Sequence, residues 1–420
     1  MTIGRRIGFV STRLAGTDGV SLETVKWVNV LNGLGCQSYF FAGETDWPAE
    51  YSFVVPEAHF NHPEILALNV DLFDDFQRLP DTSQQTTRLK AHLKEQLYQF
   101  LHNCRPDVLI VENALSLPMN IPLGLALTEL IAETSIPTIA HHHDFAWERE
   151  RYAVSAAGDY LRAAFPPTLP RIRHVVINSF AEQELALRTG LSSILIPNVM
   201  DFNTPPPDPD DYVADFKAEL AIDPAECLIL QPTRIVPRKR IEMSIELTRR
   251  IALDTCLVIT HHAGDEGQAY ENYLREYANL MGVKVLFAAD RFAPNRGSTS
   301  DGKKIYSLRD AYYMADLVSY PSRVEGFGNA FLETIYFRRP IVMSSYDIFK
   351  TDIQPKGFEI IAFTDFITDN CVQRAEQVLR DPALADEMCK QNFEIGRRHY
   401  SYRTLETRLE TVLNERLGYD

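Results

Sequence analysis

The sequence contains no apolar run near the roughly 20 residues that a transmembrane helix needs, and its longest apolar stretches have the length of strands. Its opening segment, MTIGRRIGFVSTR, has neither the apolar core nor the small-residue cleavage site of a secretory signal. The six cysteines are scattered and form no CxxC pair, which argues against a disulfide framework and a zinc site. We therefore expect a globular, cytoplasmic protein that does not insert into a membrane.

Positive charge is also scarce, because 42 Lys and Arg stand against 57 Asp and Glu and leave a net charge of −15. Both parts of the chain are acidic when it is divided at Asn203. A basic face broad enough for duplex nucleic acid or an anionic bilayer is therefore not expected. Small clusters of Lys and Arg can still bind a phosphorylated small molecule, so we expect small-molecule partners. The sequence leaves the oligomeric state open.

Strand-like and helix-like segments alternate along the 420 residues, a length typical of two to three domains. Unbroken apolar runs, such as 107–111, 227–231 and 317–320, are separated by amphipathic helices. This alternation predicts an α/β fold in which parallel sheets are covered on both faces. We predict two Rossmann-like βαβ domains that face each other across a cleft, with ligands bound at the carboxyl ends of the strands.

A proline-rich segment divides the chain. Four of the five positions 205–209 are proline, which fits neither a helix nor a central strand, so TPPPDPDDY (204–212) predicts a stiff, extended linker. We predict one domain at 1–203 and a second at 213–398. An amphipathic helix is predicted within 399–420, and we expect it to pack back on the first domain.

The stretch EGFGNAFLE follows the predicted strand at 317–320 and opens a helix near Asn329. Its two glycines let the backbone approach a ligand closely, and the first N–H groups of the helix point toward that ligand. Glu325 and Glu333 place two carboxylates along one wall, where they can accept from the vicinal hydroxyls of a hexose or ribose. The alternative is a glycine-bearing turn with two solvated glutamates.

The stretch RIVPRK follows the predicted strand at 227–231. Arg234 can hold a phosphate with two hydrogen bonds, and Lys239 adds a compact second charge. Together they can neutralise a diphosphate leaving group. The alternative is a surface loop whose basic side chains lie in solvent.

The stretch GTDG (16–19) connects the first predicted strand to the first predicted helix. It lacks the GxGxxG pattern, and no acidic residue stands convincingly at the end of the second strand, so dinucleotide binding is disfavoured. Gly19 would give a ligand close access to the backbone. The alternative is a tight turn with no ligand.

The stretch HHHD ends another predicted strand. Alternation along a strand places His141 and His143 on one face and His142 on the other. A metal site would need further ligands at suitable spacing, and the sequence reveals none, so we expect no metal. We interpret the histidines and Asp144 as hydrogen-bonding groups that line the site, with a purely structural histidine as the alternative.

Together with IPNVMD, which precedes the proline segment, these motifs resemble the retaining glycosyltransferases of family four, which have the two-domain GT-B architecture. EGFGNAFLE is similar to the E-x7-E motif of that family, and RIVPRK to its Arg-x4-Lys diphosphate clamp. IPNVMD is similar to its hinge and HHHD to its His-Asp loop. The resemblance covers nearly the whole chain. The sequence departs from the family at Val199, where a glycine is common, and at GTDG, where a Gly-Gly pair is common.

The resemblance implies a metal-independent enzyme without a cofactor, which transfers a hexose with retention to a small soluble acceptor. Its donor would be a nucleoside-diphosphate sugar such as GDP-mannose, UDP-glucose or GDP-glucose. The catalytic residues that it implies are Arg234, Lys239, Glu325 and His143. The donor-binding residues that it implies are Gly19, Asp144, Phe327, Gly328, Asn329 and Glu333. In these roles the two cations hold the diphosphate, Glu333 accepts from the ribose, and His143 contacts the sugar from the opposite domain.

The segments VSTRLAGTDGVSLE and HHHDFAWERERY are similar to a subgroup that makes glycerate-based compatible solutes by transferring a mannosyl unit to a glucosyl phosphoglycerate. This resemblance implies that Arg13, Arg149 and Arg151 bind the phosphate of the acceptor. Two rival functions stay open: a nucleotide-sugar 2-epimerase of the same architecture, and a non-catalytic protein that binds nucleotide sugars. A nicotinamide oxidoreductase is disfavoured because the dinucleotide fingerprint is missing.

Overall fold

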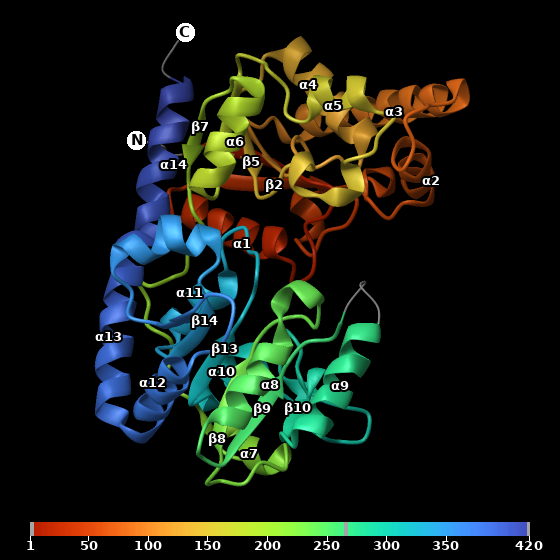
Figure 1. Cartoon of the computed structure of the whole chain (residues 1–420). Helices are drawn as coiled ribbons and strands as arrows, with labels where there is room; N and C mark the ends of the chain where they lie inside the picture. The colour runs from red at the N-terminus through yellow and green to blue at the C-terminus, as the bar shows by residue number, and fades with distance from the viewer. Residues whose placement is uncertain (1–3, 264–267, 418–420) are drawn as a thin grey trace. The chain divides into compact units, whose positions relative to one another are not determined.

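The computed structural model describes residues 4–263 and 268–417, and these form two compact α/β units (Figure 1). The first unit contains the chain up to Val199 together with the segment that starts at Tyr402, and the second is Met200–Ser401. Each unit has one main sheet of parallel strands, which confirms the predicted fold class. The outermost residues of the first and last predicted segments, 1–3 and 418–420, lie outside the described residues.

The first unit is built on a seven-stranded parallel sheet in the order β3-β2-β1-β4-β5-β6-β7. Its strands are β1 (Arg6–Val10), β2 (Gln37–Ala42), β3 (Ser52–Val54), β4 (Val108–Glu112), β5 (Thr138–His142), β6 (Ile172–Val176) and β7 (Ser193–Leu195). β4 and β5 are buried at every position, because helices cover both faces of a parallel sheet. Their pairing sets Glu112 opposite His141 at the carboxyl ends of the two strands.

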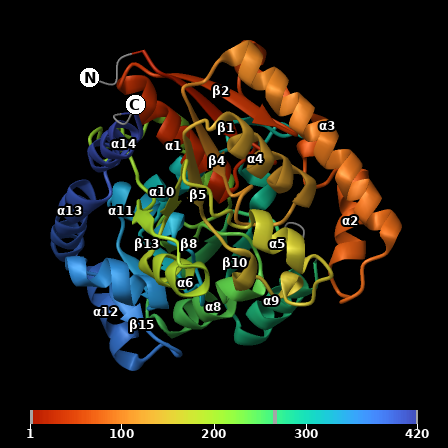
Figure 2. The ribbon, with the colours of Figure 1, turned by 90° about the horizontal axis from the view of Figure 1, so that it is seen from above.

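Helices pack on both faces of this sheet, and each face has its own apolar cluster. The helices are α1 (Gly19–Gly33), α2 (Pro63–Leu72), α3 (Pro80–Cys104), α4 (Ile121–Thr134), α5 (Gly158–Ala164), α6 (Ser179–Thr189) and α14 (Tyr402–Leu417). On one face, Trp27 and Leu31 of α1 share a cluster with Leu405 and Leu409 of α14, which lies beside α1 (Figure 2). The last helix therefore packs on the first unit through its apolar stripe, as its sequence pattern predicts.

The second unit has a six-stranded parallel sheet in the order β10-β9-β8-β13-β14-β15. Its strands are β8 (Cys227–Gln231), β9 (Thr255–Ile259), β10 (Val285–Phe287), β13 (Leu317–Tyr320), β14 (Ile341–Ser344) and β15 (Ile361–Phe363). A separate antiparallel pair consists of β11 (Gly297–Ser298) and β12 (Lys304–Ile305). Because β8 and β13 are neighbours in the centre of the sheet, the loops that follow them start from the same edge.

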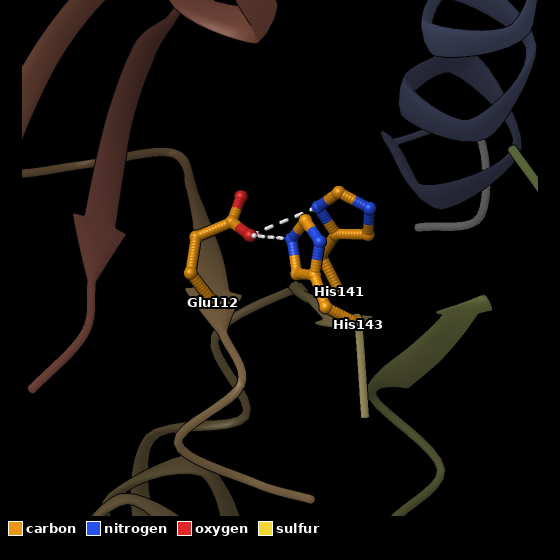
Figure 3. Close-up of side chains that lie close together, drawn as sticks. All are labelled: Glu112, His141 and His143. Atoms are coloured by element: carbon orange, nitrogen blue, oxygen red, sulfur yellow. Dashed lines mark hydrogen bonds and ion pairs between the residues drawn. The ribbon is translucent and has the colours of Figure 1, made fainter. Parts of the chain in front are cut away.

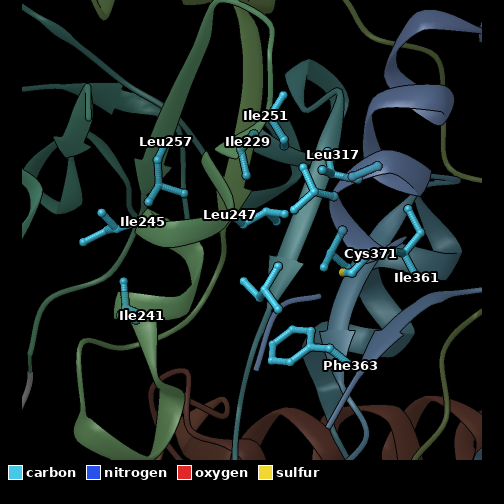
Figure 4. Close-up of a cluster of buried hydrophobic side chains, with 14 of the residues drawn as sticks. Ile229, Ile241, Ile245, Leu247, Ile251, Leu257, Leu317, Ile361, Phe363 and Cys371 are labelled. Atoms are coloured by element: carbon cyan, nitrogen blue, oxygen red, sulfur yellow. The ribbon is translucent and has the colours of Figure 1, made fainter. Parts of the chain in front are cut away.

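Seven α-helices accompany this sheet among the described residues: α7 (Phe216–Glu219), α8 (Ile241–Arg250), α9 (Ala269–Met281), α10 (Leu308–Met314), α11 (Asn329–Tyr336), α12 (Asp369–Arg380) and α13 (Pro382–His399). Figure 4 shows the core on one face, where Ile229 and Leu257 of the sheet pack with Ile245 of α8 and Cys371 of α12. No helix in the described part of the chain is both long and apolar enough to span a bilayer.

The proline-rich segment lies against the second unit. Residues 204–210 form neither helix nor strand, as their prolines require. The hydroxyl of Tyr313 donates to the carbonyl of Pro207, and the hydroxyl of Tyr212 donates to the carbonyl of Ile305 at 2.9 Å. The segment is therefore tied to the second unit by hydrogen bonds.

Candidate active site

In the second unit, side chains from RIVPRK and EGFGNAFLE meet at the carboxyl ends of β8 and β13. Lys239 ends a short 3-10 helix (Pro237–Lys239) just before α8, and its ammonium pairs with the carboxylate of Glu325. A second cation, the guanidinium of Arg238, lies 3.6 Å from the same carboxylate. The two motifs, which are distant in the sequence, are thus joined by ion pairs.

Burial sets the electrostatics of this pair, because the side chains of Lys239 and Glu325 are only 10% and 11% exposed. Burial opposes ionisation of Glu325, but the positive charges of Lys239 and Arg238 outweigh it and lower the pKa of the carboxyl. Burial also lowers the pKa of Lys239, although Glu325 opposes that shift. Each charge compensates the other for its removal from water.

Arg234 lies in the turn after β8 with an exposed side chain, and its charge acts on Lys239. The sequence patterns do not single out His261, which follows β9 and is influenced by both cations. Burial, followed by the charges of Arg234 and Lys239, lowers the pKa of His261 to about 4. His261 is therefore a neutral group beside the cations, and its position after a strand end is the signal that could have revealed it.

The turn between Glu325 and α11 depends on Gly328. This residue has a φ of +114°, in the left-handed region that favours glycine, and it caps the N-terminus of α11. The hydroxyl of Tyr346 donates to the carbonyl of Phe327 at 2.6 Å, and a Cβ added at Gly328 would lie 2.4 Å from that hydroxyl. Phe327 is itself buried, with 3% of the residue exposed. Asn329 follows as the first residue of α11.

Glu333 lies farther along α11 and is half-buried. One oxygen of its carboxylate accepts a hydrogen bond from the hydroxyl of Tyr312 at 2.9 Å. Tyr312 is buried, and its burial, with the nearby charge of Glu333, raises the pKa of the phenol well above its ordinary value. Tyr312 therefore acts as a donor that fixes the orientation of the Glu333 carboxylate.

In the first unit, the alternation predicted for HHHD is confirmed. His141 and His143 both face the carboxylate of Glu112, whereas His142 faces the other way and meets His174 at 2.9 Å. Oε2 of Glu112 lies 2.9 Å from Nδ1 of His141 and 3.0 Å from Nε2 of His143 (Figure 3). The sequence patterns miss Glu112, because it ends an apolar strand 31 residues before His143 and only the strand pairing brings it there.

The charge of this cluster is set by burial and by the histidines. Burial opposes ionisation of Glu112, which is 0% exposed, but the charges and hydrogen bonds of His141 and His143 lower its pKa to about 2. Burial alone would lower the pKa of His143, but its hydrogen bond to Glu112 and the charges of Glu112, Glu23 and Asp144 raise it. Burial lowers the pKa of His141 in spite of Glu112. Glu112 therefore favours the protonated form of His143, whereas burial favours the neutral form of His141.

Glu112, His141 and His143 also form the one group of three side chains, among the described residues, whose donor atoms lie close enough together to hold a metal ion. All three atoms lie within 4.8 Å of one another. Because Nε2 of His143 hydrogen-bonds to Oε2 of Glu112, two of these atoms are already engaged with each other. We interpret the group as a cluster in which both histidines pair with the carboxylate.

Asp144 and the two arginines after it form a second feature at the end of β5. The guanidinium of Arg149 pairs with Asp144 at 2.8 Å. The guanidinium of Arg151 lies 4.7 Å from the centre of the Tyr152 ring. Arg149 therefore adds a positive charge directly beside the HHHD turn.

Arg13 and Gly19 lie at the end of β1 and the start of α1. The side chain of Asp18 caps α1 by accepting from the backbone N–H groups of Val20 and Ser21 at 3.0 and 3.1 Å. Its other oxygen pairs with Arg13 at 2.9 Å. Gly19 is exposed as the first residue of the helix. Part of the charge of Arg13 is thus already compensated, as is that of Arg149.

Comparison with protein-family models finds no match. Two curated relatives are both called mannosylglucosylglycerate synthase. The protein from Petrotoga mobilis is 34% identical over 380 residues, which are 85% of this chain and 86% of that protein. The protein from Thermotoga maritima is 32% identical over an alignment that covers 96% of this chain and 98% of its own length. Among solved structures, Anabaena HepE in complex with UDP-glucose has a TM-score of 0.66 at 12% identity and covers 98% of this chain and 100% of that one.

Two Rossmann-like units with parallel sheets, and the similarity to solved glycosyltransferases, define the GT-B fold. The chain is a glycosyltransferase. At 34% and 32% identity over most of both chains, it belongs to the mannosylglucosylglycerate synthase family.

Proposed function

We propose that the protein is a retaining mannosyltransferase, which moves mannose from a nucleoside-diphosphate mannose to a hydroxyl of a glucosylglycerate. The name shared by the two relatives supports both the sugar and the acceptor. The observation that carries the proposal is the meeting of Lys239 and Glu325, beside Arg234, at the carboxyl ends of β8 and β13. Cations at the carboxyl edge of a parallel sheet suit the binding of a diphosphate.

The cations would act on the leaving group. When the bond between the sugar and the diphosphate breaks, positive charge develops on the sugar and negative charge on the phosphate oxygen. Lys239, which Glu325 holds in place, and the N-terminus of α11 would stabilise that negative charge without having to reorganise, and Arg234 would add a further positive charge. Glu325 would keep the ammonium of Lys239 in place while the donor binds.

Retention would follow from the route of the proton. The bond between the anomeric carbon and the phosphate oxygen breaks, and a bond to the acceptor oxygen forms on the same face of the sugar. The acceptor hydroxyl gives its proton to the departing phosphate oxygen. No second carboxylate is needed as nucleophile or general acid, in contrast to a glycosidase, and no metal is needed because the protein supplies the cations.

Arg13 and Arg149 support an acceptor with a carboxylate. Each guanidinium is held by an aspartate, at 2.9 and 2.8 Å, so each has less positive charge to offer than an uncompensated arginine. Such a site can bind the carboxylate of a glycerate. We therefore propose glucosylglycerate as the acceptor, and its phosphorylated form as the competing substrate.

A donor and acceptor panel tests the proposal. The purified protein is incubated with GDP-mannose, GDP-glucose or UDP-glucose, each alone, with glucosylglycerate and with glucosyl-3-phosphoglycerate. We expect nucleoside diphosphate to be released fastest from the mannose donor with glucosylglycerate, with the anomeric configuration retained in the product by NMR. A chelator should leave the rate unchanged. Formation of an epimer from the donor alone would indicate an epimerase, and donor binding without turnover would indicate a non-catalytic protein.

The acceptor site is tested by Arg149→Ala and Arg13→Ala. Since a hydrogen bond to a charged group contributes about 1.5–3 kcal/mol, each change should raise KM for the acceptor by roughly tenfold or more. The KM for the donor should stay unchanged. Arg88→Ala is the matched control, because Arg88 forms a similar ion pair with Glu64 on the surface of the same unit. An unchanged KM for the acceptor in both variants would contradict this assignment.

A further inference from the structure

The buried carboxylate of Glu112 has no part in the roles described so far. It is 0% exposed at the last position of β4, and isolating such a charge from water is costly unless something compensates it. His143 and His141 provide that compensation at 3.0 and 2.9 Å.

The backbone around the cluster is fixed as firmly as the side chains. Register between β4 and β5 sets Glu112 opposite His141. The next residue, Asn113, has a φ of +58°, and its Oδ1 accepts from the backbone N–H of His143 at 2.7 Å. Glu112 and Asn113 thus hold the ring and the backbone of the same histidine.

The contact also selects the nitrogen that carries a proton. An ionised carboxylate can only accept, so Nε2 of His143 must donate to Oε2 of Glu112. Nδ1 is then the nitrogen that remains for another partner. In the same way, a buried carboxylate fixes the tautomer of a histidine in many catalytic sites.

We propose that Glu112 is a positioning residue for sugar transfer, which holds the ring of His143 through Nε2 and leaves Nδ1 as the nitrogen that meets the donor. This inference rests on the proposed function, because it assumes that His143 contacts the sugar nucleotide. With both nitrogens protonated, His143 would present an N–H donor and a positive charge to the substrate. The charged and titratable groups that act on His143 are Glu112 of β4, Glu23 of α1, His141 of β5, His142 of β5 and Asp144.

The main test compares Glu112→Gln with Asp310→Asn. Glutamine keeps the shape and an acceptor oxygen but removes the negative charge. Asp310 is another wholly buried carboxylate, but it pairs with Arg296 and caps α10, so it controls for the loss of a buried charge. Both variants are assayed for kcat and KM across the pH range, together with the thermal midpoint.

We expect Glu112→Gln to lower kcat by about tenfold or more on the alkaline side, since a fall of one unit in the pKa of His143 reduces its protonated fraction by that factor. The alkaline limb of the kcat profile should move to lower pH, while KM for the donor changes little. Asp310→Asn should lower the thermal midpoint and leave the pH profile in place. If Glu112→Gln gives the wild-type pH profile and only a lower midpoint, its role is structural and the proposal is wrong.

A measurement on the unchanged protein keeps the proposal testable if Glu112→Gln does not fold. The nitrogen signals of His143 are recorded by NMR on histidine-labelled protein and assigned through their loss in His143→Gln. We expect a proton on Nε2 at every pH, with titration confined to Nδ1. A neutral His143 with its proton on Nδ1 would overturn the proposal, as would stoichiometric zinc that is lost in His143→Gln. This readout needs no turnover, so it is independent of whether the wild-type protein transfers mannose.

Discussion

Each unit of the protein places one buried carboxylate at the carboxyl end of a parallel strand and surrounds it with basic side chains. In the first unit the carboxylate is Glu112, and its partners are His141 and His143. In the second unit it is Glu325, with Lys239 and Arg238 as partners. The two clusters share a plan but differ in the chemistry of the cation.

That difference assigns different tasks to the two clusters. Lysine and arginine have ordinary pKa values far above neutrality, so they suit a permanent positive charge toward a diphosphate. Histidine changes its charge near neutral pH, so its state depends on the carboxylate behind it. Glu112 stands on a strand, whereas Glu325 stands in a loop shaped by glycine. In our proposal, the first cluster orients the ring of His143, and the second cluster, together with the glycine-containing turn before α11, binds the diphosphate.

The variant with the largest expected effect removes the positive charge of Lys239 from the second cluster. Lys239→Ala should lower turnover by roughly a hundredfold or more, because the charge that meets the leaving phosphate is lost. It should also reduce the free energy of unfolding by about 3–5 kcal/mol, since Glu325 loses a partner while it stays buried. Turnover is measured on protein whose folding has been verified by circular dichroism. Near-normal turnover would contradict the proposed role of the second cluster.

Lys303→Ala is the matched control for that change. Lys303 pairs with Asp301, and both side chains are more than half exposed. Removal of such a surface pair should change the free energy of unfolding by less than about 1 kcal/mol and leave turnover normal. A large loss in this variant would show that lysine removal in this unit acts through something other than the site.

The turn between Glu325 and α11 is tested next by Gly328→Ala. A side chain there has to adopt a φ of +114° and would approach the hydroxyl of Tyr346 to 2.4 Å. Gly357→Ala separates the cost of the positive φ from the cost of the contact with Tyr346. Gly357 also has a positive φ, of +89°, but no atom lies within 4 Å of an added Cβ. We expect Gly328→Ala to be less stable than Gly357→Ala by about 1–3 kcal/mol, the usual cost of overpacking. It should also raise KM for the donor.

A double variant tests whether contact with the hydroxyl of Tyr346 causes the loss of stability in Gly328→Ala. Tyr346→Phe removes the hydroxyl that an added Cβ would meet, at the cost of the hydrogen bond to Phe327. The double variant Gly328→Ala/Tyr346→Phe should therefore recover part of the stability lost in Gly328→Ala, measured by denaturant unfolding. If the second change adds its full cost to the first, the clash is not the cause.

Sequence patterns predict the parts of the site that are local. The turn in EGFGNAFLE, the basic residues of RIVPRK and the opposite faces of His141 and His142 follow from spacing, glycine and strand alternation. The packing of α14 on the first unit follows in the same way from a stripe of leucines. Each of these features depends on residues that are close together in the chain.

The other contacts of the site depend on which strands are neighbours in the sheet. The spacing of residues along the sequence does not reveal the strand order. In the sequence, Glu112 is only the last residue of an apolar run. The pairing of β4 with β5 is what places it opposite His141. Tyr346 stabilises the backbone of Phe327 from the loop after β14, a neighbour of β13. His261 joins the cations only because β9 lies beside β8. In a parallel sheet, the partners of a site residue come from distant segments, and the strand order decides which ones.

The smallest expected effect concerns the stability of the first cluster as a function of pH. In the folded state the pKa of His143 is raised above its ordinary value of 6.5, so its protonation stabilises the fold. That contribution is complete below about pH 6.5 and is lost as the pH rises through the folded pKa. Glu112, with a pKa of about 2 against an ordinary 4.5, stays ionised throughout that rise. We therefore expect the free energy of unfolding, measured in denaturant, to fall on the alkaline side.

Glu112→Gln should weaken or reverse this dependence. Without the carboxylate, burial dominates and lowers the pKa of His143, so stability should increase as the pH rises and the buried ring loses its charge. Burial already lowers the pKa of His141, so that residue acts in the same direction in both proteins. The difference between the two stability curves thus reports the effect of Glu112 on His143 and His141 together. Parallel curves would mean that the carboxylate does not control the proton of His143, and the contrast between the two clusters would then be one of position only.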